Sequence, residues 1–126
     1  MEFFIIYIKE AHPSDGRVVA ANTRAGISVK DPASLTERQR IADKACKELS
    51  LRWPCLVDDM KNTVNKAYAA WPTRLYVVDT EGRIVVASNP GPGGLAPSIK
   101  EAEKWLNAFT AQSKSSDVTP ANRGTP

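Results

Sequence analysis

Few side chains in this sequence could carry chemistry, and the stretch YIKEAHPSDG holds the first of them. It contains Glu10 and His12, and His12 is the single histidine of the chain. Histidine exchanges a proton near neutral pH, and a carboxylate beside it can orient the ring or hold its proton. Taken alone, a histidine in a His-Pro-Ser-Asp-Gly turn is more often an ordinary turn residue than a catalytic one.

The other candidates are two cysteines and two adjacent aspartates. Cys46 and Cys55 are too far apart in the sequence for a C-x-x-C redox pair or a zinc knuckle. Both are expected as small buried apolar residues, with a reactive thiol at Cys55 as the alternative. Asp58 and Asp59 could act as an acid pair or as metal ligands, but charge at a strand end and a helix start explains them better. The sequence therefore predicts no metal site and no bound cofactor.

Short strands and helices are expected to position these residues. Apolar runs bounded by turn residues predict strands at residues 3–8, 54–58, 74–79 and 83–87. Helices are predicted after three N-cap signals, of which the first and last are capping boxes: Ser34 with Glu37, Asn62, and Ser98 with Glu101. The strand at 3–8 is expected to be covered on both faces. The alternation predicts an α/β fold for residues 1–111, and the segment 112–126, poor in apolar residues, predicts a disordered tail.

The bulk composition excludes several classes of protein. The 126 residues carry a net charge of +3 with 42% hydrophobic and 25% charged residues, which suits one small globular domain. The basic residues are scattered, so the sequence predicts no nucleic-acid partner. The run FFIIYI is too short to cross a membrane and lacks the features of a signal peptide. A cytoplasmic protein without a membrane partner is expected.

Longer segments resemble a known family. AAWPTRLYVVDTEGRIVVA resembles the second half of a thioredoxin fold, with Pro72 at the cis-proline position, and PCLVDDMKNTVNKAYAAWP resembles the insert of the peroxiredoxin-like branch. Together with FFIIYIKEAHPSDGR and GPGG, they are similar to the iodothyronine deiodinase family and its bacterial deiodinase-like members, from Phe3 to about Leu106. The resemblance implies a thioredoxin-like α/β fold and a cis Trp71–Pro72 bond.

The resemblance also implies an activity and a site. Members of this family are oxidoreductases that remove iodide reductively from an iodinated phenol, with a thiol reductant as co-substrate. Glu10 and His12 are implied to line the active site as catalytic residues, with Pro72 at its edge. Arg17 stands where the family usually has tryptophan, and KDPASL stands where it has a second histidine. Both differences argue against a thyroid-hormone-like substrate.

One part of the family pattern has no counterpart in the sequence. No cysteine precedes Cys46, so the strand-helix unit that carries the cysteine or selenocysteine nucleophile is expected to be missing. The chain is then an N-terminally truncated member that is inactive alone. Its sheet would be open between residues 3–8 and 74–79, which predicts poor solubility or a homodimer through that edge. Two alternatives stay open: a non-catalytic binding module on a thioredoxin fold, and a thiol peroxidase-like enzyme that uses Cys55.

Overall fold

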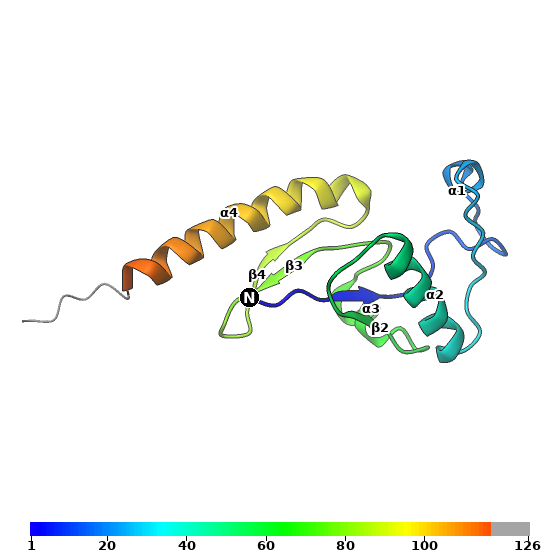
Figure 1. Cartoon of the computed structure of the whole chain (residues 1–126), viewed down its shortest axis with the longest axis horizontal. Coiled ribbons are helices and arrows are strands. Elements are labelled where there is room, and N and C mark those ends of the chain that lie inside the picture. The colour runs from blue at the N-terminus through cyan, green and yellow to red at the C-terminus, as the bar shows by residue number, and fades with distance from the viewer. Residues whose placement is uncertain (117–126) are drawn as a thin grey trace, which may run out of the picture. The chain divides into compact units, whose positions relative to one another are not determined.

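The computed structural model describes residues 1–116, and the chain folds as two compact units, Met1–Thr73 and Arg74–Pro126. The elements are, in order, β1 (Ile5–Tyr7), α1 (Ala20–Arg24), α2 (Leu35–Glu48), β2 (Cys55–Val57), α3 (Thr63–Tyr68), β3 (Tyr76–Val78), β4 (Ile84–Ala87) and α4 (Pro92–Ser116) (Figure 1). The predicted mixed α/β class is confirmed. The short α1 was not expected, because residues 17–32 show no clean period.

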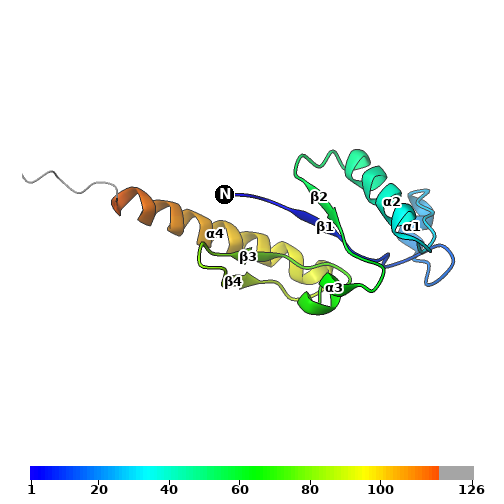
Figure 2. The same cartoon turned by 90° about the horizontal axis from the view of Figure 1, so that it is seen from below.

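The first unit is built on two parallel strands. β1 pairs with β2 in the register Ile5↔Cys55 to Tyr7↔Val57, and α2 packs against β2 (Figure 2). The Asp58 N–H donates to the Tyr7 carbonyl at 2.9 Å, which continues the pairing past the end of β2. The carboxyl ends of both strands therefore meet at one edge.

Within the first unit, β1 is covered on one face and not on both faces as expected. Ile6 is 42% exposed, and its register partner Leu56 is 49% exposed. Their neighbours along each strand are half-buried. Side chains alternate between the two faces of a strand, so one face of this sheet is covered and the other is open. A short apolar run does not reveal this difference, because it reads the same in both cases.

The helix predicted after Ser34 is confirmed. The Ser34 Oγ accepts a hydrogen bond from the Glu37 N–H at 3.2 Å. The Glu37 Oε2 accepts in turn from the Ala33 N–H at 2.8 Å, one residue before the N-cap. This reciprocal pair fixes the start of α2, and the helix buries Arg38 and Ala42 against the rest of its unit.

The helix start predicted at Asn62 is right in position but not in its cap. Asn62 has a left-handed backbone and makes no side-chain capping bond. The Asp58 carboxylate accepts from the N–H groups of Val64 and Asn65 at 3.0 and 2.9 Å. Asp59 accepts from the N–H and the hydroxyl of Thr63 at 3.0 and 2.6 Å. The interpretation of the two aspartates as helix-start charge is confirmed.

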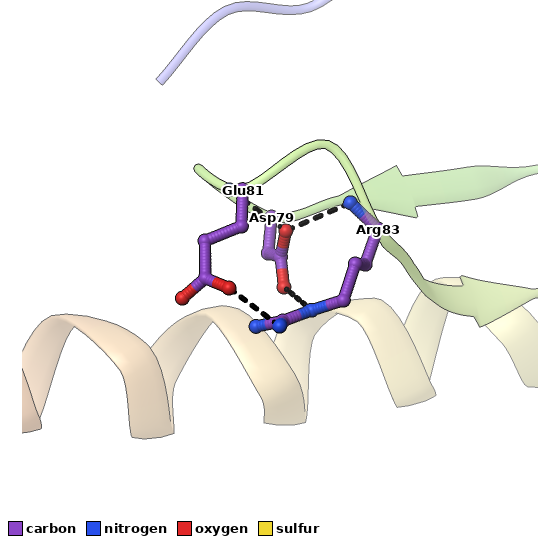
Figure 3. Close-up of polar contacts among 3 residues, drawn as sticks. All are labelled: Asp79, Glu81 and Arg83. Carbon is purple, nitrogen blue, oxygen red and sulfur yellow. Dashed lines mark hydrogen bonds and ion pairs between the residues drawn. The ribbon is translucent and has the colours of Figure 1, made fainter.

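The second unit begins with an antiparallel hairpin. β3 pairs with β4 in the register Tyr76↔Ala87, with an irregularity after Val77. Asp79 organises the turn, because its Oδ1 accepts from the N–H groups of Glu81 and Arg83, both at 2.9 Å, and its Oδ2 pairs with the Arg83 guanidinium (Figure 3). The pKa of Asp79 lies below its ordinary value, and the largest cause is the hydrogen bond from the backbone N–H of Arg83.

The last helix starts earlier than predicted. α4 runs from Pro92 and packs against β4, so the start expected at Ser98 and its capping box with Glu101 are wrong. Ser98 lies inside the helix, where its hydroxyl donates to the Gly94 carbonyl at 2.7 Å. Proline suits a first helical position because its φ is already helical and its missing N–H would have no partner there. The sequence NPGPGG hides this start, since glycine and proline usually indicate a loop.

The far end of α4 also differs from the expectation. Residues 112–116 continue the helix into the segment predicted to be a disordered tail. The remainder of that segment, 117–126, lies outside the described residues. None of the helices among the described residues combines the length and the apolar character needed to cross a bilayer.

Each strand of the described residues pairs with one neighbour. The two sheets hold two strands each. Each of the four strands therefore keeps one edge with no strand partner in the described part of the chain.

Gly94 should be intolerant of a side chain. A Cβ built there lies 2.2 Å from the Asn89 carbonyl oxygen and 2.6 Å from its carbon, whereas a Cβ at Gly93 meets nothing within 4 Å. We expect Gly94→Ala to cost about 1–3 kcal/mol, since backbone atoms must move. Gly93→Ala is the matched control and should be neutral or stabilise by about 0.5–1 kcal/mol. Equilibrium unfolding in urea measures both, and equal effects would contradict the contact.

Candidate functional site

A tight loop follows β1 and holds the predicted site residues. The Ser14 N–H donates to the Val29 carbonyl at 2.7 Å, and the Asp31 N–H donates to the Asp15 Oδ1 at 3.0 Å. The Gly16 N–H closes the turn on the Pro13 carbonyl at 3.1 Å. Hydrogen bonds thereby hold residues 10–16 against residues 29–31 at the carboxyl end of β1. Open α/β sheets bind ligands at this end of their parallel strands.

His12 lies within this loop with one ring nitrogen enclosed. The residue is half-buried, and its Nδ1 is buried with no hydrogen-bond partner among the described residues. Buried polar atoms normally have a partner, so one that lacks it calls for an explanation.

Glu10 lies two residues before His12, also half-buried. Burial raises the pKa of the Glu10 carboxyl above its ordinary value, and the negative charge of Asp31 raises the pKa further. A carboxyl whose pKa is raised holds its proton at higher pH, as a proton donor must. Asp31 was missed in the sequence, although it lies in the segment KDPASL where a second family histidine was sought.

The protonation of Glu10 should couple to folding. The native carboxyl binds its proton more tightly than the unfolded one, whose pKa is near 4.5. Stability is therefore greatest below pH 4.5 as far as this group is concerned, and it falls as the pH rises through the folded pKa. We expect Asp31→Asn to lower the pKa of Glu10, so that the pH range between the unfolded and the folded pKa becomes narrower. The carboxyl carbon shift of Glu10 in an NMR titration measures this pKa. Asp15→Asn is the control for the loss of a nearby acid. An unchanged titration of Glu10 in Asp31→Asn would contradict the influence of the Asp31 charge on Glu10.

The segment around Pro72 lies near the same loop within the first unit. The Trp71–Pro72 peptide bond is cis, as predicted. The Lys9 ammonium stands over the Trp71 ring at 5.5 Å from its centroid, and Lys9 directly precedes Glu10. The structure thus brings the Trp71–Pro72 segment to the edge that carries the predicted site residues.

Two further polar atoms belong to this unit and were not singled out in the sequence. The Tyr7 hydroxyl, on the last residue of β1, is buried without a partner among the described residues. The Arg38 Nε is in the same state, although its Nη1 donates to the carbonyls of Asp58 and Asp59 at 3.3 and 2.6 Å. A tyrosine in an apolar strand does not reveal in the sequence that its hydroxyl is buried without a partner. An arginine on a helix usually predicts an exposed charge, so the burial of Arg38 was not expected either.

The cysteines lie away from this edge. Cys55 is in register with Ile5, the first residue of β1, whereas Glu10 and His12 follow its last residue. Burial, and next a hydrogen bond with Cys46, raise the pKa of Cys55 to about 12. The thiolate is the nucleophilic form, so these surroundings disfavour Cys55 as a nucleophile. Among residues 1–116, no three His, Cys, Asp or Glu side chains are grouped to hold a metal ion.

Comparison with known proteins shows the family to which the chain is related. The family model described as iodothyronine deiodinase matches residues 1–110. The chain belongs to the iodothyronine deiodinase family. This family has the thioredoxin fold, and the match covers the loop of Glu10 and His12 as well as the Trp71–Pro72 segment.

Individual deiodinases agree with this assignment. A thyroxine 5-deiodinase from Sus scrofa is 36% identical over 115 residues, which cover 89% of this chain and 34% of that protein. A thyroxine 5-deiodinase from Gallus gallus is 34% identical over 114 residues, which cover 90% of this chain and 42% of that protein. A type I iodothyronine deiodinase from Xenopus laevis is 36% identical over 107 residues. The chain thus spans between a third and a little over two-fifths of the length of these relatives.

Proposed function

We propose that this chain is the proton-handling part of a deiodinase-type oxidoreductase. The reaction is the reductive removal of iodide from an iodinated phenol, with a thiol as the reductant. It takes place at the carboxyl end of β1, where Glu10 and His12 are catalytic and Pro72 stands at the edge. The observation that carries the proposal is the His12 loop itself, in a chain of the deiodinase family. The Nδ1 of His12 is buried without a hydrogen-bond partner among the described residues, and the carboxyl of Glu10, two residues earlier, has a raised pKa.

The chemistry of the reaction explains why such a loop is needed. Replacing iodine by hydrogen on a phenol ring requires a proton at the ring carbon, and two thiols supply two electrons as they form a disulfide. Of the two protons that the thiols lose, one goes to the ring carbon and the other is released together with iodide, so atoms and charge balance. A carboxyl of raised pKa can hold that proton, and a histidine can transfer it near neutral pH.

We propose further that the nucleophile comes from outside the 126 residues. Cys46 and Cys55 are the two cysteines of the sequence, and neither lies at the His12 edge. A strand-helix unit that pairs with the open edge of β1 would bring a cysteine or selenocysteine to it, in the manner of the peroxiredoxin-like branch of the thioredoxin fold. The start of a helix lowers the pKa of such a group and so activates it.

The experiment compares two proteins in the release of free iodide from an iodinated phenol with dithiothreitol. We expect no release above background by the 126-residue chain. The protein produced with its in-frame upstream coding sequence should release iodide in proportion to enzyme. The Cys55→Ser variant of the short chain is the control for an unexpected thiol reaction.

Two outcomes would contradict this assignment. Release by the short chain that disappears in Cys55→Ser would favour the thiol peroxidase-like alternative. No release by an extended protein that does carry a cysteine or selenocysteine ahead of β1 would favour the non-catalytic binding module.

The open strand edges also support a proposal about association. Unpaired backbone groups on an exposed edge can pair with a second chain, and the exposed Ile6 and Leu56 lie beside one such edge. We propose that the 126-residue chain alone forms a homodimer through β1. Analytical ultracentrifugation should show a concentration-dependent dimer, and Ile6→Lys should shift it toward monomer. A monomer at all concentrations would contradict the proposal.

A further inference from the structure

The segment after β1 carries a lysine that contacts an exposed tryptophan. Lys9 is exposed, and it comes two residues after β1 and directly before Glu10. Its ammonium stands 5.5 Å from the centroid of the Trp71 ring, which is within the range of a cation–π contact. Trp71 is itself 42% exposed and directly precedes Pro72. A positive charge and an open indole therefore lie together at the edge that carries the proposed site residues.

Both groups keep room for a further partner. A lysine ammonium has three donors, and in the part of the chain that the structure describes no oxygen accepts from that of Lys9, because the ion pairs there involve Lys44 and Arg83. The Trp71 ring stacks on no other aromatic ring among residues 1–116. A cation–π contact at an exposed position stabilises a fold only weakly, and it leaves both groups available to a ligand.

The two residues follow neighbouring strands, and backbone hydrogen bonds fix their positions. β1 and β2 pair in parallel, so their carboxyl ends lie at one edge, where Lys9 follows β1. Asp58 holds the start of α3 just after β2. The Ala70 N–H donates to the Asn65 carbonyl at 2.9 Å where the chain leaves this helix. Trp71 is the next residue, so its contact with Lys9 joins the segments that follow the two strands.

An aromatic ring that carries an anionic oxygen matches this pair of groups. An indole packs well against another ring, and an ammonium makes its stronger hydrogen bonds to ionised oxygens. An ionised phenol, a phenolate, has both parts in one molecule. Iodine next to the hydroxyl withdraws electrons from the ring, so an iodinated phenol ionises more readily than the parent phenol. The proposed substrate therefore offers the chemistry that these two groups fit.

We propose that Lys9 and Trp71 bind the phenolate form of the iodinated phenol. The phenolate oxygen accepts from the Lys9 ammonium, and the ring lies in contact with the Trp71 indole. The inference rests on the proposed function, from which it takes the substrate. It adds a preference of the site for ionised over neutral phenols, and it assigns this preference to two residues other than Glu10 and His12.

The test is an NMR titration of the 126-residue chain with para-cresol iodinated at both positions next to the hydroxyl. The pH lies between the pKa of this phenol and the ordinary pKa of lysine, so both partners are charged. The indole N–H signal of Trp71, identified by its loss in Trp71→Phe, reports binding, and we expect it to shift until saturation. The methyl ether of the same compound cannot ionise, so it should bind at least about threefold more weakly.

Variants of Lys9 separate its charge from its apolar stem. Lys9→Met keeps a flexible apolar stem beside Trp71 but removes the charge, so it should weaken phenolate binding by about three- to fivefold. Binding of the ether should change by less than about twofold, because the ether makes no use of the charge. Lys9→Arg keeps the charge and should keep the preference. Lys44→Met is the control for the loss of one positive charge, because Lys44 pairs with Glu48 on α2, and it should also keep the preference.

Binding and iodide release fail separately, so the two proposals can be told apart. Absence of a saturable shift with the phenol, equal affinity for the phenol and its ether, or an unchanged preference in Lys9→Met would each overturn the inference, even if the extended protein releases iodide. A preference for the phenol that Lys9→Met abolishes and Lys44→Met keeps would support the inference, even if the extended protein releases no iodide and the proposed function fails.

Discussion

Replacing Asp58 by alanine should destabilise the first unit by about 3–5 kcal/mol. Asp58 is 2% exposed, and its carboxylate accepts from the N–H groups of Asp59, Val64 and Asn65 at 2.9–3.0 Å. A buried donor left without a partner costs about 1–3 kcal/mol. Alanine removes the acceptor of the half-buried N–H groups of Val64 and Asn65 and of the N–H group of the exposed Asp59. Few single substitutions in the chain should cost more.

Arg38 binds the same segment as Asp58, so that the loss of the Asp58 hydrogen bonds should also weaken those of Arg38. It is 3% exposed, and its Nη1 donates to the carbonyls of Asp58 and Asp59 and, at 3.1 Å, to the Asn62 Oδ1. The same short segment is therefore held from one side by a carboxylate and from the other by a guanidinium. If the segment loosens, a buried cation loses its acceptors, which is a costly state.

Asp59→Asn is the matched control for Asp58→Ala. Asp59 is adjacent in sequence but exposed, and asparagine keeps an oxygen that can accept from the Thr63 N–H. We expect its effect on unfolding in urea to be much smaller than that of Asp58→Ala. Amide hydrogen exchange gives a local check, since Val64 and Asn65 should lose protection in Asp58→Ala and keep it in Asp59→Asn. Equal protection in both variants would contradict the capping role.

Local sequence signals predicted the fold where one short interaction decides the outcome. The Ser34–Glu37 pair starts α2 because its partners lie three residues apart, and the element order follows from alternating apolar runs. The same kind of signal at Ser98 and Glu101 is wrong, because Pro92 already begins the helix and Ser98 turns its hydroxyl back to Gly94. Coverage of a strand depends on what packs on it from elsewhere, so Ile6 and Leu56 could not be placed from their own neighbours.

The candidate site was predictable in its position but not in its electrostatics. The Glu10–His12 segment stands out because it joins the end of an apolar run to a turn. The raised pKa of Glu10 depends on burial and on Asp31, twenty-one positions later in the sequence. Long-range proximity of this kind is a product of the fold.

Replacing His12 by alanine should reduce kcat/KM for iodide release by about 10²–10⁴-fold in the protein that carries the proposed nucleophile. A positioned acid or base contributes on this scale, and the Nδ1 of His12 is buried without a hydrogen-bond partner among the described residues. Ser14→Ala is the control, because the hydrogen bond from Ser14 to Val29 uses the backbone N–H and survives the substitution. It should leave the rate within about twofold of the unsubstituted protein.

The pH profile separates proton transfer from a merely structural role of His12. If His12 exchanges a proton in the reaction, kcat/KM depends on pH through that step, and this part of the pH dependence should vanish in His12→Ala. Glu10→Gln keeps the shape of the side chain but cannot release a proton, so it should lower the rate at every pH and remove the limb of Glu10. If His12→Ala instead lowers the rate by one factor at all pH values and keeps the profile of the unsubstituted protein, His12 shapes the loop and the proton comes from another group.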